Sequence, residues 1–273
     1  MANIDTGTEH LLATIENGVG ILTLNRPEAR NAMSGGMNDA LSRMLADWEL
    51  NNEVKCIVLT GAGKGFCAGG DVKGMDETNR GSGEPTTIDQ AIHRQRVNQR
   101  ATAGKLFKMP KPTIAALPGA AAGAGLSLAL ACDMRVMAST AIMTTAFARV
   151  GFSGDYGGTY FMTQLIGSGK ARELYYLSDR VSAEEALRLG LTNWVCEPEE
   201  LMTRTLEIAQ RLANGPTVAY RYMKENLNRA MNGEVDDCLD LEATHHVHCG
   251  KTEDHKEAAQ AFVEKREPVF RGR

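Results

Sequence analysis

Short runs of β-branched and other apolar residues alternate along the first two thirds of the chain with longer stretches in which apolar residues recur at helical spacing. Alternation of this kind is typical of strands and helices that pack in layers. The predicted strands cover residues 20–24, 56–60, 113–117 and 135–137. One buried helix face is predicted between the first two strands, by Met37, Leu41, Met44, Leu45 and Trp48. The pattern therefore predicts an α/β fold.

The last third of the chain has a helical pattern, and no strand is predicted from residue 199 onward. Just before it, Ser182 and Glu185 form a capping-box pattern, and Gly190 predicts the end of that helix. Gly215 and Pro216 end one later helix and begin the next. We expect a core of residues 1–198 and a helical oligomerisation region of residues 199–273.

Two stretches need a separate interpretation. Residues 114–131 are uncharged and long enough to span a membrane, but they contain Pro118 and are mostly alanine, so we predict a buried strand, turn and helix. Residues 75–100 hold a glycine-rich stretch and then a polar run, which predicts a loop leading into a surface helix. This helix either lines a ligand pocket or is simply a solvated face.

Composition excludes few functions, but it limits the expected binding partners and the expected cellular compartment. The 273 residues carry 30 Lys and Arg against 34 Asp and Glu, a formal charge of −4 that gives no general attraction to nucleic acid or membrane. The six cysteines form no C-x-x-C pair, and residues 1–10 lack a signal-peptide pattern. We expect a cytoplasmic protein that binds neither nucleic acid nor membrane.

Three glycine-rich turns carry the candidate chemistry, at residues 66–71, 119–125 and 151–158. The first two are suited to present backbone N–H groups, from Gly70 and from Ala124 at the start of a helix, to one oxygen atom. Two such donors stabilise the negative charge that develops on a thioester oxygen, and Asp155 in the third turn supplies a group that moves a proton. The alternatives are that the glycines only permit tight turns and that Asp155 caps its own backbone.

Other motifs give weaker signals. Residues 61–65 lack the spacing of a dinucleotide fingerprint and residues 167–170 lack the context of a P-loop, so neither NAD nor ATP is expected. The histidines at 245–248 do not have the spacing of a zinc site, and no metal is predicted. Cys67 has no evident histidine partner, which favours a packing role over a nucleophilic one.

The order of these motifs resembles the crotonase, or enoyl-CoA hydratase/isomerase, superfamily over residues 10–267. The matching segments are Leu24-Asn25-Arg26-Pro27 with Asn31-Ala32, the 66–71 turn, Lys111-Pro112 leading into residues 119–133, Gly157-Gly158-Thr159, and residues 261–266. The resemblance implies the β-β-α superhelix of the ClpP/crotonase fold, with a C-terminal helical region that builds a homotrimer or homohexamer. It also implies an oxyanion hole at the Gly70 and Ala124 N–H groups.

The resemblance further implies an acyl-CoA substrate and no separate cofactor, since coenzyme A is part of that substrate. It implies coenzyme or substrate contacts at Arg26, Ala68 and Lys73. Phe262 and Lys265 are implied to reach the coenzyme of a neighbouring subunit.

The departures from the family pattern bear on the reaction. The two glutamates with which typical hydratases of the family position water fall here on Ser127 and Phe147, which are poor replacements. Asp155 matches the aspartate of the family's dienoyl-CoA and ring-epoxide or oxepin isomerases. We expect Phe147, Phe152 and Tyr156 to bury Asp155 and raise its pKa, with Ser127, Phe147 and Tyr156 also lining the substrate pocket. The favoured function is a double-bond isomerase.

Three alternatives remain open at this point. A hydratase could use Asp155 and Ser127 around one water molecule, and a noncatalytic subunit could bind acyl-CoA without turnover. An aryl-CoA dehalogenase or hydrolase is less favoured, because the histidine that the family's dehalogenases use would fall near Arg100. The sequence does not specify the acyl group.

Overall fold

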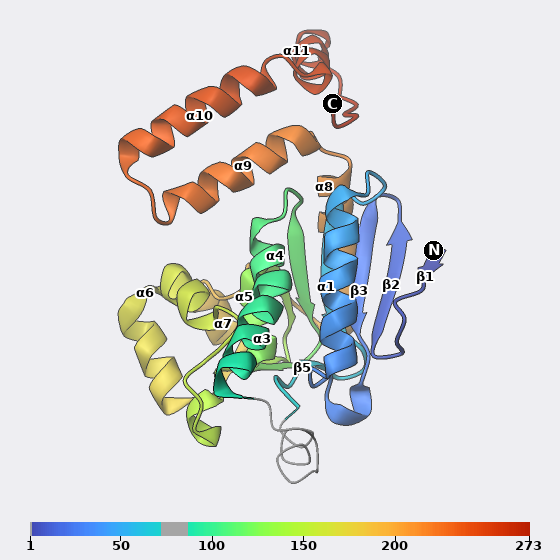
Figure 1. Ribbon diagram of the computed structural model, residues 1–273. Coiled ribbons are helices and arrows are strands. Elements are labelled where there is room, and N and C mark those ends of the chain that lie inside the picture. The colour runs from blue at the N-terminus through green and yellow to red at the C-terminus, as the bar shows by residue number, and fades with distance from the viewer. Residues whose placement is uncertain (1, 72–86) are drawn as a thin grey trace.

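A large, mainly parallel sheet forms the centre of the chain (Figure 1). The computed structural model describes residues 2–71 and 87–273. The strand order is β1-β2-β3-β4-β6-β8-β11. Their bounds are β1 (Ala2–Ile4), β2 (Leu11–Glu16), β3 (Val19–Leu24), β4 (Cys56–Gly61), β6 (Thr113–Leu117), β8 (Met134–Ala138) and β11 (Trp194–Cys196). From β3 to β11 neighbouring strands pair in parallel, so their carboxyl ends meet at one edge.

The four strands predicted from the sequence are confirmed as β3, β4, β6 and β8. All residues of β4 and β6 are buried, as expected for parallel strands that are covered on both faces. The predicted helix is α1 (Gly35–Leu50), which begins where the Ser34 side chain accepts a hydrogen bond from the Met37 N–H. Its Trp48 packs so closely on β3 that a Cβ at Gly20 would lie 2.5 Å from the indole ring.

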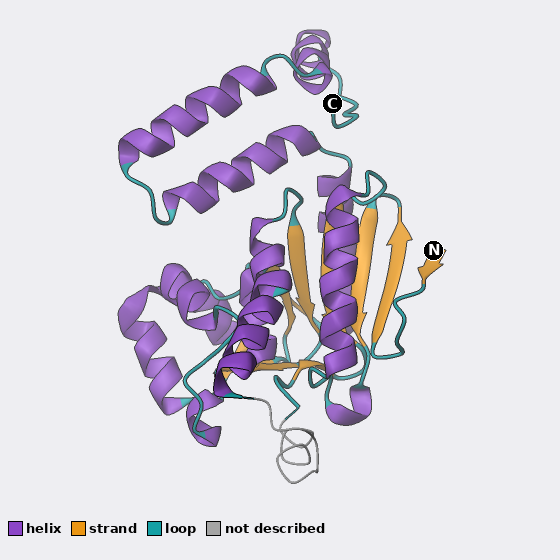
Figure 2. Cartoon of the chain, viewed as in Figure 1, coloured by secondary structure: helices purple, strands orange, loops and turns teal. Residues whose placement is uncertain are grey.

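A second, smaller sheet was not predicted. It has the order β10-β9-β7-β5 and lies across the lower end of the large sheet (Figure 2). Its strands are β5 (Gly65–Cys67), β7 (Ala120–Ala122), β9 (Ile142–Thr144) and β10 (Val181–Ser182). The uncharged stretch at 114–131 is thus β6, a turn with β7, and the wholly buried helix α5 (Ala124–Ala131), which agrees with the predicted strand, turn and helix.

Helices cover the sheets. Besides α1 and α5, the helices before the C-terminal region are α3 (Ile88–Ala101), α4 (Ala103–Lys108), α6 (Gly158–Leu177) and α7 (Ala183–Leu189). Single 3-10 turns lie at Pro27–Ala29, Phe147–Val150 and Pro198–Glu200. Ser182 caps α7 by accepting a hydrogen bond from the Glu185 N–H, whereas the Glu185 carboxylate binds Arg188 instead of completing the capping box. Gly190 ends α7 at a φ of 82°, as predicted. Residues 167–170 form a kink inside α6 at Gly167.

The C-terminal region is helical, with no strand after residue 199 in the part of the chain that the structure describes. Its helices are α8 (Leu201–Ala213), α9 (Thr217–Ala230), α10 (Val235–Cys249) and α11 (Glu253–Glu264). Helix α8 packs on the large sheet, while α9 and α10 pair with each other beyond the end of the sheet that is opposite β5 (Figure 1). The expected division at residues 198/199 stays a prediction.

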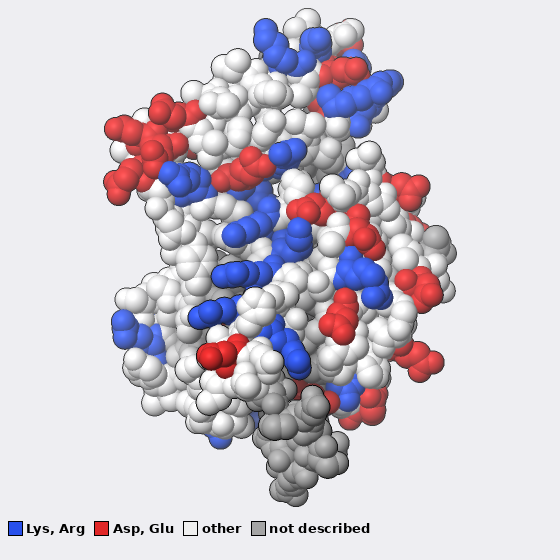
Figure 3. Space-filling view, in the orientation of Figure 1, with Lys and Arg blue, Asp and Glu red and all other residues white. Residues whose placement is uncertain are grey.

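Charge is unevenly distributed over the surface. Lys and Arg gather over α3 and α4, and Asp and Glu gather at the start of α10 (Figure 3). None of the helices in the described ranges is both long and apolar enough to cross a membrane.

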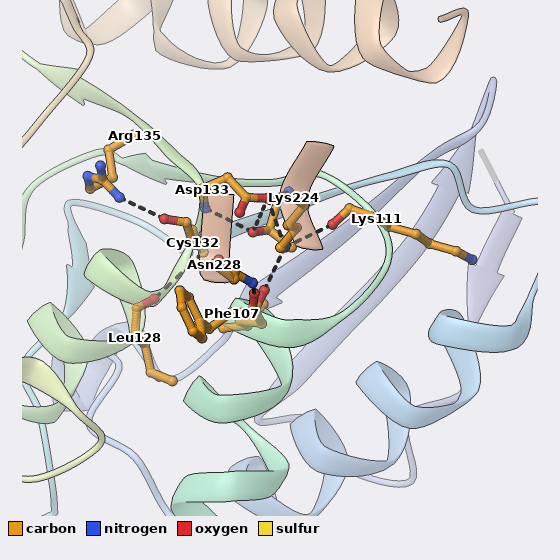
Figure 4. A network of polar contacts seen from close by, with 10 residues as sticks. Phe107, Lys111, Leu128, Cys132, Asp133, Arg135, Lys224 and Asn228 are labelled. Carbon is orange, nitrogen blue, oxygen red and sulfur yellow. Dashed lines mark hydrogen bonds and ion pairs between the residues drawn. The ribbon is translucent and has the colours of Figure 1, made fainter. Parts of the chain in front are cut away.

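A buried ion pair joins α9 to the core (Figure 4). Lys224 is 7% exposed, and its Nζ donates to the carbonyls of Leu106 and Lys111 and to Asp133 Oδ2, at 2.9–3.1 Å. Asp133 Oδ2 also accepts hydrogen bonds from the N–H and the hydroxyl of Thr113. Every polar group at this junction has a partner, so the network fixes α9 to the sheet.

Candidate active site

The candidate site lies at the carboxyl ends of the parallel strands, where open α/β sheets commonly bind ligands. Its loops are joined by Asn31, which is fully buried. The Asn31 Nδ2 donates to the carbonyls of Ala62 and Gly65, and its Oδ1 accepts from the Arg26 N–H, at 2.8–2.9 Å. One side chain thus connects the loops after β3 and β4, which explains why the Asn-Arg-Pro and Asn-Ala motifs occur together.

The first predicted N–H turn follows β5. Its Gly69 has a φ of 97°, and its carbonyl accepts a hydrogen bond from the Met33 N–H at 2.8 Å. A Cβ at Gly69 would lie 3.4 Å from the backbone nitrogen of Ala124 and 3.0 Å from the carbonyl of Ala122. The turn that carries Gly70 and the start of α5 therefore meet, as the oxyanion-hole prediction requires.

Helix α5 presents its N-terminus at this contact. The helix begins after Gly123, which has a φ of 52° and a ψ of −127°. Because glycine has no side chain, no side-chain hydrogen bond caps this helix end. Because the first N–H groups of a helix have no intrahelical acceptor, that of Ala124 is available to a ligand. The close approach also needs Gly125, where a Cβ would be 2.4 Å from the Cys67 carbonyl. Two of the three glycine-rich turns thus lie side by side.

Asp155 lies in the third turn, and its carboxylate does not cap its own backbone. Its Oδ1 is buried and has no hydrogen-bond partner among the described residues. Burial raises the pKa of this carboxyl to about 6. The prediction of a raised pKa agrees with the geometry, but one expected neighbour was wrong, since Phe152 is 57% exposed.

The residue that does cover Asp155 is Tyr175 of α6, which the sequence analysis missed. A Cβ at Gly154 would be 3.1 Å from the Tyr175 ring, and that ring stacks on Phe147 with centroids 5.9 Å apart. The Tyr175 hydroxyl lies beside Ser127. A Cβ at Gly158 would be 2.5 Å from the Tyr175 hydroxyl oxygen and 2.3 Å from Ser127 Oγ. Burial and the Asp155 charge raise the pKa of Tyr175, so the phenol is neutral near pH 7.

The two positions expected to line the pocket beside α5 are both enclosed. Ser127 is 1% exposed, and its hydroxyl donates to the Gly123 carbonyl at 3.3 Å. Phe147 is 7% exposed, and its ring is 3.7 Å from where a Cβ would stand on Gly123. Neither side chain offers a carboxylate; the nearby carboxylate is that of Asp155, which interacts with Tyr175 beside Ser127.

Tyr156 is buried next to Asp155 and takes a φ of 48°. Burial and the adjacent carboxylate raise the pKa of its hydroxyl to about 12, and the amide of Asn38 on α1 opposes this rise. Like Asp155 Oδ1, the buried Asn38 Oδ1 has no partner within the described ranges. Two unpaired oxygen atoms therefore flank Tyr156, which is unusual outside ligand sites.

Two candidates from the sequence analysis do not take part in chemistry here. Burial raises the pKa of the Cys67 thiol to about 12, which keeps it protonated and agrees with a packing role. His245 binds Asn226 Oδ1 at 2.6 Å and stacks on Tyr222 at 4.2 Å. The described residues hold no group of three or more side chains that could ligate a metal.

The predicted coenzyme contacts are spread over both ends of the chain. The Arg26 Nη1 donates to the Ala32 carbonyl and to Asp71 Oδ2, each at 2.9 Å, and Ala68 is exposed. Lys73 lies outside the described residues. Phe262 is 86% exposed, and Lys265 directly follows α11. Helix α11 lies at the end of the folded molecule opposite to β5 (Figure 1). Phe262 and Lys265 are therefore distant from the Gly69 turn within this chain.

The same architecture occurs in solved structures. A putative enoyl-CoA hydratase from Streptomyces coelicolor A3(2) superposes with a TM-score of 0.91 at 34% sequence identity, covering 97% of this chain and 94% of that one. The chain therefore has the crotonase fold, as the sequence predicted.

Sequence comparison then gives the family. The family model for enoyl-CoA hydratase/isomerase matches residues 14–273, and the chain belongs to that family. One relative is the 1,2-epoxyphenylacetyl-CoA isomerase of Escherichia coli K12, 35% identical over 97% of this chain and 99% of the relative. Another is the short-chain-enoyl-CoA hydratase of Clostridium acetobutylicum, 35% identical over 92% of this chain and 93% of the relative. Relatives of similar identity thus include both an isomerase and a hydratase.

Proposed function

We propose that the protein is an acyl-CoA double-bond isomerase in which Asp155 is the general acid and base. The observation that carries this proposal is the buried Asp155 Oδ1, which has no hydrogen-bond partner among the described residues. An unpaired carboxylate in a folded interior costs stability, and such groups occur where a ligand or a reaction uses them. The 35% identity to a 1,2-epoxyphenylacetyl-CoA isomerase is compatible with isomerase chemistry but does not by itself favour it over hydration, because a short-chain-enoyl-CoA hydratase is equally identical.

The carbonyl oxygen of the thioester would be held by the N–H groups of Gly70 and Ala124. Loss of a proton from the acyl chain moves negative charge onto this oxygen, and two fixed donors stabilise that enolate without adding charge to the site. Each donor typically contributes about 3 kcal/mol to such a transition state. The meeting of the Gly69 turn with the start of α5 supports this pairing.

Asp155 would remove a proton from one carbon of the acyl chain and return it to another. A carboxyl with a pKa of about 6 is mostly ionised at neutral pH, yet it holds a proton well enough to return it. The Ser127 hydroxyl already donates to a backbone carbonyl and Phe147 has no polar group, so neither supports activation of water. This favours isomerisation over the hydration that other family members perform.

Binding and assembly follow the same proposal. Arg26, Ala68 and Lys73 would contact the coenzyme of one subunit, and Phe262 and Lys265 that of a neighbour. The exposed apolar side chains of the C-terminal helices support burial in a homotrimer or homohexamer: Met223, Leu227, Val235, Leu239, Val247, Phe262 and Val263. The reaction needs no cofactor beyond the coenzyme A of its substrate. All six cysteines are free, which supports a reducing, cytoplasmic setting.

The test uses wild-type protein and Asp155→Asn with 2-enoyl, 3-enoyl, dienoyl and aryl-acetyl CoA thioesters in deuterated water, followed by mass spectrometry. Wild-type protein should introduce deuterium and shift a double bond without adding the mass of water. The Asn variant should bind the same thioester with unchanged affinity and turn it over about 10²- to 10⁴-fold more slowly.

Three results would contradict the proposal in different ways. Addition of water by the wild-type protein would make it a hydratase that uses Asp155 and Ser127. Binding of every thioester without turnover would favour the noncatalytic alternative. Near-normal turnover by Asp155→Asn would exclude this carboxylate as the proton carrier.

A further inference from the structure

A hydrogen bond from a distant helix holds the turn that carries Asp155. The Gln99 Oε1 of α3 accepts from the backbone N–H of Tyr156 at 2.5 Å, across 57 positions in the sequence. The Tyr156 N–H belongs to the peptide group that directly follows the Asp155 Cα. This bond therefore fixes the backbone next to the Asp155 side chain.

Within the turn itself, the Asp155 carbonyl accepts a hydrogen bond from the Gly158 N–H at 3.1 Å, and the Gln99 bond adds a constraint from outside it. Tyr156 adopts a left-handed φ of 48°, between Gly154 at 114° and Gly157 at 77°. Left-handed backbone is unfavourable for a residue with a Cβ and persists only where the surroundings impose it. The Gln99 carbonyl supplies such a constraint and also pairs a backbone N–H that is partly buried.

Helix α3 is suited to act as a support. Its N-terminus has a complete capping box, with Thr87 and Gln90 each bonding the other's backbone N–H. No residue of α3 in the described range is buried, so Gln99 is not one of a set of core-packing side chains. Its contact with Tyr156 is therefore a specific polar contact rather than part of general packing.

We propose that Gln99 is a positioning residue that keeps the Asp155 carboxylate in its buried orientation. The inference rests on the proposed function, in which Asp155 moves the proton. It adds a part of the site that neither the glycine turns nor the family motifs include.

The surroundings of Asp155 make the proposal measurable. The titratable groups that face the carboxyl are Tyr156, Tyr175 of α6 and Cys67 at the end of β5, and all three are neutral near pH 7. Burial alone raises the pKa of Asp155. If the turn relaxes, water reaches the carboxylate and this pKa falls towards the value of an exposed aspartate.

Three variants separate a positioning role from a general structural one. Gln99→Leu removes the acceptor at similar size, and Gln99→Glu keeps an acceptor but adds a negative charge. Gln95→Leu makes the same chemical change one turn earlier on the same helix, where the structure gives the side chain no comparable bond. We expect Gln99→Leu to lower kcat about 10- to 100-fold with little change in KM.

The acid limb of the pH profile should fall by about one pH unit in Gln99→Leu. In Gln99→Glu the acid limb should move to higher pH, and at pH values above this limb the variant should retain most of the wild-type kcat. In Gln95→Leu the acid limb should stay unchanged. Equal effects of Gln99→Leu and Gln95→Leu would overturn the proposal. So would a loss of kcat in Gln99→Leu without a shift of the acid limb.

Titration of the Asp155 carboxyl by infrared difference spectroscopy makes the test independent of the reaction. The Asp155 band is assigned by its absence in Asp155→Asn. If the panel of thioesters shows no turnover, the proposed function fails, and a downward shift of this band's midpoint in Gln99→Leu would still support the positioning role. An unchanged midpoint would contradict it.

Discussion

Two partly buried aspartates of this chain have opposite surroundings. Asp133 Oδ2 accepts hydrogen bonds from the Thr113 N–H, the Thr113 hydroxyl and the Lys224 ammonium, at 2.7–3.0 Å (Figure 4). Asp155 Oδ1 has no partner among the described residues, and burial raises its pKa. The first carboxylate joins two parts of the fold, whereas the second is left free to react.

The difference shows that burial alone does not distinguish a structural carboxylate from the proposed proton carrier. A buried charge with a full set of hydrogen bonds is stabilised in one state, which makes it a poor proton carrier. A buried carboxylate without partners changes its protonation state easily, at a cost in stability. The number of partners, rather than the depth of burial, distinguishes the two roles.

The strongest way to break this comparison is to make the same substitution at both positions. Asp155→Asn should lower kcat about 10²- to 10⁴-fold and leave the free energy of unfolding unchanged or higher, because it removes an unpaired charge. Asp133→Asn should lower the free energy of unfolding by about 2–4 kcal/mol, because Lys224 then lacks its counter-charge. Steady-state kinetics and urea unfolding measure both quantities.

Each variant serves as the control for the other. Asp133→Asn should keep a kcat close to that of wild type at a temperature where it remains folded. If Asp155→Asn destabilised the protein as much as Asp133→Asn does, Asp155 would be a structural residue and the distinction would fail.

Local motifs predicted the fold and named the Gly69 turn and the start of α5, which the structure brings together, but they did not predict Tyr175 and Gln99 near Asp155. The Asn-Arg-Pro and Asn-Ala motifs lie close in sequence, and the Asn31 Oδ1 accepts a hydrogen bond from the Arg26 N–H only five residues away. Tyr175 and Gln99 reach the site from α6 and α3, whose sequences give no local signal of this contact. The apolar character of Phe152 suggested a neighbour of Asp155 that is in fact exposed. The strands of the small sheet, two or three residues long, were missed because so short a segment shows no period.

Two glycines of α6 provide a test of how tightly the site is packed. A Cβ at Gly158 would be 2.3 Å from Ser127 Oγ and 2.5 Å from the Tyr175 hydroxyl, so Gly158→Ala should lower the free energy of unfolding by about 1–3 kcal/mol and also reduce kcat. Gly169→Ala is the matched control, because nothing lies within 4 Å of its Cβ position. The control should gain about 0.5–1 kcal/mol from its helical propensity.

The outcome separates the packed side of the site from the rest of the helix. Thermal unfolding and kcat should be measured for both variants. A Gly158→Ala protein with wild-type kcat would mean that Ser127 and Tyr175 can move without affecting Asp155, and the description of an enclosed site would be wrong.

The smallest effect, and the one that sharpens the comparison most, is the pH dependence of stability. Asp155 has a pKa of about 6 in the folded chain, against about 3.9 for an unfolded aspartate. Below pH 4 the carboxyl is protonated in both states, so it contributes no pH dependence. As the pH rises from 4 to 6 the unfolded chain ionises first, and the folded state loses stability relative to it.

Asp155→Asn removes this titration, so its free energy of unfolding should rise relative to wild type between pH 4 and 6 and then stay level. After a discount for partial solvent access, the difference at the plateau should be about 1–2 kcal/mol. Asp133→Asn should be less stable than wild type throughout this range, because Lys224 loses its counter-charge. Urea unfolding of the three proteins across this range measures the difference directly. A flat difference between wild type and Asp155→Asn would mean that the folded environment does not disfavour the charge, and Asp155 would then resemble Asp133 in kind.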